Sequence, residues 1–171
     1  MANDLIDQLR GSLAEFDGKA VSLLTETEAM LGSRPGYLDG LIAVAGDREV
    51  SVGDGATWLF KSALESGQTL SVGQSEHLIA TLPDLKGWAA QLHICQSVRY
   101  FSLDETQAEV VAGWLEPLLA HKRPFLRAWS LDAIWCLAKS HDKLRDRADT
   151  ALSNAENDDA ASVRARARNL K

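Results

Sequence analysis

The amino-acid sequence predicts an all-α fold. Apolar residues recur with helical spacing in one segment after another, glycines and capping serines stand where helices would end or begin, and one helical motif occurs twice. No segment has the pattern of a convincing strand. A chain of 171 residues is long enough to bury a hydrophobic core without a disulfide or a metal ion, so we expect a single domain over residues 1–171.

The first part of the chain contains four predicted helices. The first carries Leu5, Leu9, Leu13 and Phe16 on one apolar stripe and ends near Gly18. The other three are expected over residues 19–31, 37–45 and 53–65.

A glycine-rich segment leads into the fourth of these helices. Gly46, Gly53 and Gly55 suggest a phosphate-binding loop at a helix amino terminus. Against this, no Gly-Lys-Ser/Thr follows the glycines and no strand of convincing length precedes them. A turn followed by a helix is therefore the favoured interpretation.

Two capping signals begin helices later in the chain. Ser71 with Gln74, and Ser102 with Glu105, each fit the S/T-x-x-E/Q capping box, in which the two side chains bond to free backbone N–H groups. Together with the apolar periodicity, they predict six helices, over residues 73–82, 84–101, 104–121, 124–140, 142–155 and 159–170.

Residues 82–95 (LPDLKGWAAQLHIC) and 123–136 (RPFLRAWSLDAIWC) are two copies of one motif, at an offset of 41. The aligned pairs are Pro83 with Pro124, Leu85 with Leu126, Lys86 with Arg127, Trp88 with Trp129, and Cys95 with Cys136. In a third, shorter copy, Val163-Arg164 takes the place of Leu126-Arg127 at an offset of 37, six residues after Asp158.

This pattern resembles the HEAT-like helical repeats, whose unit is about 40–47 residues and whose second helix begins near an Asp and continues with Val-Arg. The resemblance implies an α-α superhelix, a right-handed solenoid of antiparallel helix pairs in which neighbouring pairs share one core. It covers residues 71–171 best, and residues 1–70 are expected to be an N-terminal cap or degenerate repeats. The core is expected to include Trp88, Leu92, Leu126, Trp129 and Ile134.

Charge and hydropathy restrict the partners. The formal net charge is −6, and all of the negative excess lies in residues 1–80, with twelve acids and five bases. This argues against a dedicated nucleic-acid binder, which usually carries an excess of positive charge. No membrane span or signal peptide is recognisable, so a cytoplasmic location without membrane contact is expected.

The reactive side chains do not form a recognisable site. The two cysteines, Cys95 and Cys136, lack a C-x-x-C partner, and the four histidines lack metal-ligand spacing, so no metal and no cofactor are expected. Each cysteine is expected to pack as a small hydrophobe, with a redox pair as the alternative. No catalytic residue is predicted.

The candidate binding residues come from the repeat. Lys86, Arg127 and Arg164 occupy equivalent positions and would form a basic ladder, although in HEAT-like families the corresponding arginines usually bond acids and carbonyls between repeats. Asp132 lies in the middle of an apolar helix, where a carboxylate needs a partner. Its repeat equivalent is Gln91, which favours a hydrogen bond between repeats over a catalytic acid.

These observations favour a non-catalytic interaction module or scaffold that binds a protein partner on its concave face. The alternative is nucleic-acid binding or DNA base excision, since HEAT-like alkylpurine DNA glycosylases use tryptophans, an aspartate and arginines on such a face. An enzyme is the less favoured class, and the sequence does not specify an oligomeric state.

Overall fold

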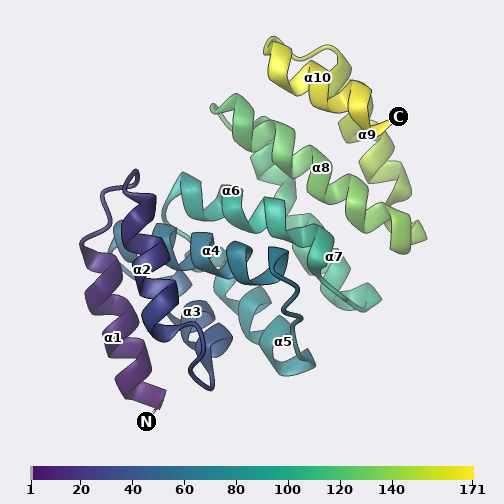
Figure 1. Ribbon diagram of the computed structural model, residues 1–171. Coiled ribbons are helices and arrows are strands. Elements are labelled where there is room, and N and C mark those ends of the chain that lie inside the picture. The colour runs from purple at the N-terminus through teal and green to yellow at the C-terminus, as the bar shows by residue number, and fades with distance from the viewer. Residues whose placement is uncertain (1) are drawn as a thin grey trace. The chain divides into compact units, whose positions relative to one another are not determined.

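The computed structural model describes residues 2–171, and these residues contain helices and no strand (Figure 1). The α-helices are α1 (Ala2–Ala14), α2 (Val21–Leu31), α3 (Tyr37–Ala45), α4 (Val50–Glu65), α5 (Val72–Thr81), α6 (Trp88–Ser97), α7 (Glu105–Leu115), α8 (Pro124–Ser140), α9 (Arg145–Glu156) and α10 (Ala161–Leu170). Short 3₁₀ helices are η1 (Leu82–Asp84), η2 (Val98–Tyr100), η3 (Glu116–Ala120) and η4 (Asp142–Leu144). The predicted all-α fold is confirmed.

The chain forms two compact units, Met1–Ile94 and Cys95–Lys171, and the division falls inside α6. Counted from the sequence, residues 1–94 contain 13 acids and 6 bases, whereas residues 95–171 contain 11 acids and 12 bases. The first unit therefore carries the whole negative excess, and the second is close to neutral.

In the first unit, α3 and α4 pack against each other and against α1. The core comprises large side chains with almost no exposed surface, among them Leu9, Leu13, Leu41, Leu59 and Phe60. The apolar stripe predicted for the first helix is buried, as expected for an amphipathic helix that packs on its neighbours.

Gly53 and Gly55 lie inside α4, so they do not form a phosphate-binding loop. A Cβ atom at Gly53 would lie 2.7 Å from the backbone oxygen of Ala45, and one at Gly55 would lie 2.8 Å from a methyl carbon of Leu13. The two glycines thus allow α4 to approach α3 and α1 closely, which is a packing function.

Helix α6 begins at Trp88, four residues later than predicted. Its amino terminus is capped from α4: the backbone N–H of Ala90 donates to Asp54 Oδ1 at 2.9 Å. A Cβ at Gly87 would lie 2.0 Å from the same oxygen, so glycine gives the carboxylate access to the helix end. Burial raises the pKa of Asp54.

One of the two predicted capping boxes is confirmed, and the other begins at a different residue. Ser71 and Gln74 form the box at the start of α5 as expected. At the start of α7 the box consists of Asp104 and Gln107, so the assignment to Ser102 and Glu105 is wrong. An Asp carboxylate is at least as good an N-cap as a serine hydroxyl, and it stands next to the first helical residue.

In the second unit, α8 contacts α7, α9, α10 and η3. Its buried side includes Leu126, Leu131 and Ile134, which pack in a core with Leu115 and Val163. The predictions for Leu126 and Ile134 are confirmed.

Three other core predictions need correction. Trp88 is 40% exposed, because it is the first residue of α6 and lies at the helix end. Trp129 and Leu92 are half-buried. On α8, Phe125 near the helix start is 61% exposed, whereas residues 126–138 are buried or half-buried.

Candidate functional site

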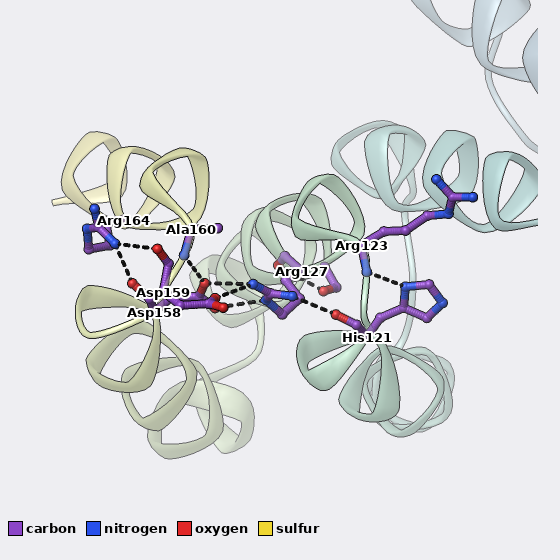
Figure 2. A network of polar contacts seen from close by, with 8 residues as sticks. His121, Arg123, Arg127, Asp158, Asp159, Ala160 and Arg164 are labelled. Atoms are coloured by element: carbon purple, nitrogen blue, oxygen red, sulfur yellow. Dashed lines mark hydrogen bonds and ion pairs between the residues drawn. The ribbon is translucent and has the colours of Figure 1, made fainter.

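The three members of the predicted basic ladder have different environments. Lys86 is exposed in the first unit, and its Nζ lies 4.0 Å from Asp84 Oδ1. Arg127 and Arg164 lie in the second unit, on α8 and α10, and both belong to one polar network (Figure 2).

Arg127 lies at the centre of this network, as Figure 2 shows. Its Nε and Nη2 donate to the two carboxylate oxygens of Asp158, each at 2.8 Å. Nη2 also donates to Asp159, and Nη1 to the backbone oxygen of His121, again at 2.8 Å. The paired guanidinium lowers the pKa of Asp158 to about 2. All three nitrogens of the guanidinium are therefore engaged within the protein.

Arg164 repeats part of this geometry. Its Nη1 donates to the backbone oxygen of Asp158 at 2.6 Å, and Asp158 lies six residues before it. The bond from Arg127 to the backbone oxygen of His121 spans the same six residues. The two copies of the motif thus share a hydrogen bond as well as a sequence pattern, and in both copies the arginine fixes the turn that precedes its own helix.

Asp132 lies on α8 with only 3% of its surface exposed. Its Oδ2 accepts a hydrogen bond from Arg99 Nη2 at 2.6 Å, and its Oδ1 accepts one from Arg166 Nη1 at 3.2 Å. Arg99 belongs to η2 and Arg166 to α10, so one carboxylate joins three helical segments. A buried carboxylate needs such partners, because an unpaired charge in the interior is strongly unfavourable.

Trp129, one turn before Asp132, lies against both arginines. The Cζ atoms of Arg166 and Arg99 are 4.1 Å and 5.5 Å from the centre of its ring, within the range of a cation–π interaction. We call Arg99, Trp129, Asp132 and Arg166 the Arg–Trp cluster. Two guanidinium groups and one carboxylate leave it with an excess of one positive charge.

A pocket of about 370 Å³ adjoins this cluster, since Arg99 also forms part of its wall. Its charged and titratable lining residues are Arg99, Cys136, Lys139 and His141. Apolar side chains from η2, the following loop and α8 form the rest of the wall, namely Val98, Phe101, Leu103 and Leu137. Within the described part of the chain, no Asp or Glu lines this pocket.

The two cysteine thiols are not activated as nucleophiles. Burial raises the pKa of the Cys95 thiol, and burial together with Asp132 raises that of Cys136. A thiol with a raised pKa is a weak nucleophile, because the thiolate is the reactive form. Nδ1 of His141 lies 3.1 Å from Glu105 Oε1, so this ring already has a carboxylate partner.

Across residues 2–171, no group of three or more His, Cys, Asp or Glu side chains is arranged to hold a metal ion. In the same residues, no helix combines the length and the apolar character that crossing a bilayer requires.

Comparisons with protein-family models, with curated proteins and with solved structures each find no match. What the site binds is therefore inferred from its geometry alone.

The structure gives Asp132 partners that sequence reasoning missed. Arg99 carried no signal, because it lies outside the repeated motif. Arg166 stands at the repeat position of Trp129, at the same offset of 37 that relates Arg164 to Arg127. That equivalence was the available indication that Arg166 and Trp129 lie side by side.

Proposed function

We propose that this protein is a non-catalytic helical-repeat interaction module that binds a protein partner through the side of α8 that carries Phe125 and the Arg–Trp cluster. We further propose that its helix pairs stack in the HEAT-like manner and that this side of α8 belongs to the concave face. The shared hydrogen bond of Arg127 and Arg164 supports the repeat, because it recurs at equivalent positions of two successive units.

The observation that carries the binding proposal is the side of α8 on which the exposed Phe125 stands one turn before the half-buried Trp129. Phe125, Trp129, Asp132 and Cys136 are spaced by four, three and four residues, so they share one side of the helix. Phe125 is 61% exposed, and the Trp129 ring is bordered by two partly exposed arginines. Aromatic and arginine side chains of this kind supply most of the binding energy at protein interfaces.

DNA base excision is the second candidate, because the cluster brings together a tryptophan, an aspartate and arginines. Two features weigh against it. Asp132 is buried and bonded to both arginines, so its carboxylate is not presented to a substrate. The formal net charge of −6 also opposes a polyphosphate backbone.

Site-specific photocrosslinking in a lysate tests the proposal. A photoreactive amino acid replaces Phe125 in one variant and Val72, which is 73% exposed on α5, in a matched control. We expect a discrete protein adduct from position 125 that persists after nuclease treatment and is absent from position 72. A nuclease-sensitive adduct would support the nucleic-acid alternative, and equal labelling from both positions would contradict a specific face.

A further inference from the structure

We propose that Arg99 and Arg166 form a paired guanidinium site for carboxylates in an acidic segment of a partner protein. The adjacent pocket would accept an apolar side chain of the same segment. This inference rests on the proposed function and specifies the chemistry of the partner.

Arg99 and Arg166 differ from Arg127 in how many of their guanidinium nitrogens already donate hydrogen bonds within the protein. Arg127 donates from Nε, Nη1 and Nη2 to groups within the protein. Within residues 2–171, Arg99 and Arg166 each donate from a single nitrogen, to Asp132. Their side chains are 40% and 28% exposed, against 13% for Arg127. The remaining donors of Arg99 and Arg166 are thus available to an external acceptor, and guanidinium–carboxylate hydrogen bonds are among the stronger ones in proteins.

The two guanidinium groups are held in place before any ligand arrives. Asp132 binds one of them on each of its oxygens, and the Trp129 ring supports both. Binding therefore costs less side-chain entropy than it would with two mobile arginines. The single carboxylate neutralises only half of the positive charge, so the pair still attracts an anion.

The pocket beside Arg99 adds apolar side chains to the site. Its wall combines Val98, Phe101, Leu103 and Leu137 with the cationic Lys139 at the end of α8. A volume of about 370 Å³ offers room for one large side chain. A segment with acids on both sides of an apolar residue would bring its carboxylates to Arg99 and Lys139 while burying that residue.

Charge favours an acidic peptide over a nucleic acid. A protein binds a nucleic acid by neutralising several phosphates, and its affinity depends on the number of Lys and Arg side chains that contact them. This chain has a formal net charge of −6, and the cluster itself contributes an excess of one positive charge. A short acidic segment requires only the local charges and gains from contact with the apolar side chains in the pocket wall as well.

Fluorescence polarisation with defined probes tests the inference. The probes are a labelled short peptide in which acids flank Leu-Phe, the same peptide with Gly-Ser in place of Leu-Phe, the same peptide with lysines in place of the acids, and a labelled thymidine oligonucleotide. We expect saturable binding of the first peptide, weaker binding of the second and no binding of the other two.

The variants Arg99→Gln and Arg166→Gln are each expected to weaken binding of the first peptide about tenfold, as for loss of one charge-assisted contact. Lys139→Gln gives a smaller loss without touching the buried carboxylate, so it remains informative if an arginine variant unfolds. The matched control is Arg168→Gln, on α10 and exposed, which we expect to change the affinity less than twofold.

Three results would overturn the inference: no binding of the acidic peptide by the wild type, equal weakening by Arg168→Gln, or preferential binding of the oligonucleotide. A protein adduct at position 125 combined with any of these results would leave the interaction module intact and refute only the acidic-segment chemistry. Absence of the adduct would refute the proposed function itself.

Discussion

His93 on α6 makes the stability of the protein depend on pH in a calculable way. Its ring is mostly buried, and its Nδ1 lies 3.0 Å from the hydroxyl oxygen of Thr57 on α4. Burial, with a contribution from Lys61, lowers its pKa from 6.5 to about 4. In the unfolded chain the imidazole binds a proton below pH 6.5, whereas in the folded chain it stays neutral. Stability is therefore lost as the pH falls from 6.5 toward 4.

The magnitude follows from the two pKa values. One pKa unit corresponds to about 1.4 kcal/mol, so lowering the pH from about 7.5 to about 4.5 removes roughly 2–3 kcal/mol of unfolding free energy through His93. Nearby Asp54 acts in the opposite direction at lower pH, because its pKa is raised. Comparison with a His93→Gln variant cancels the contribution of this and other carboxyl groups.

Urea unfolding of both proteins, followed by circular dichroism at the two pH values, provides the measurement. The wild type should lose roughly 2–3 kcal/mol more than His93→Gln. Equal losses in the two proteins would refute the assignment of a neutral, buried imidazole at position 93.

Three further predictions concern the basic-ladder residues Arg127 and Lys86, the Asp54 cap of α6, and the two cysteines. Arg127→Ala should lower the unfolding free energy of the second unit by about 2 kcal/mol, whereas the repeat-equivalent Lys86→Ala should change stability by less than about 0.5 kcal/mol in the same urea assay. Asp54→Ala should cost about 1 kcal/mol and speed amide hydrogen exchange in the first turn of α6, and unchanged exchange would contradict the cap. Iodoacetamide at neutral pH should modify Cys136 slowly and Cys95 more slowly still, as mass spectrometry of timed samples would show; faster labelling of Cys95 would contradict its burial.

The helices could be predicted from sequence because their signals are local. The predicted segment 124–140 coincides with α8, since Pro124 begins it and apolar residues at helical spacing continue to its end. The start of α6 could not be predicted in this way, because its cap, Asp54, is 36 residues from Ala90. The start of α7 was misassigned because a neighbouring serine matched the same short pattern that Asp104 and Gln107 form.

The candidate site was only partly predictable. Periodicity shows that α8 is apolar on more than one side, but it does not show which side other helices cover, and so Trp129 was assigned to the core. The need of Asp132 for a partner followed from its apolar surroundings. The identity of the partners did not, because Arg99 and Arg166 are 33 and 34 residues away and their approach depends on how the helices pack.

The central claim is that a partner protein binds at the Arg–Trp cluster of the second unit. The chain contains five tryptophans, and the indole N–H of each gives its own nuclear magnetic resonance signal, assigned through Trp129→Phe and similar variants. Titration of the nitrogen-15-labelled protein with the partner identified by crosslinking is the most direct test. We predict that the Trp129 indole signal shifts most, together with the side-chain signals of Arg99 and Arg166. Shifts confined to residues 1–94, with Trp129 unchanged, would contradict the account.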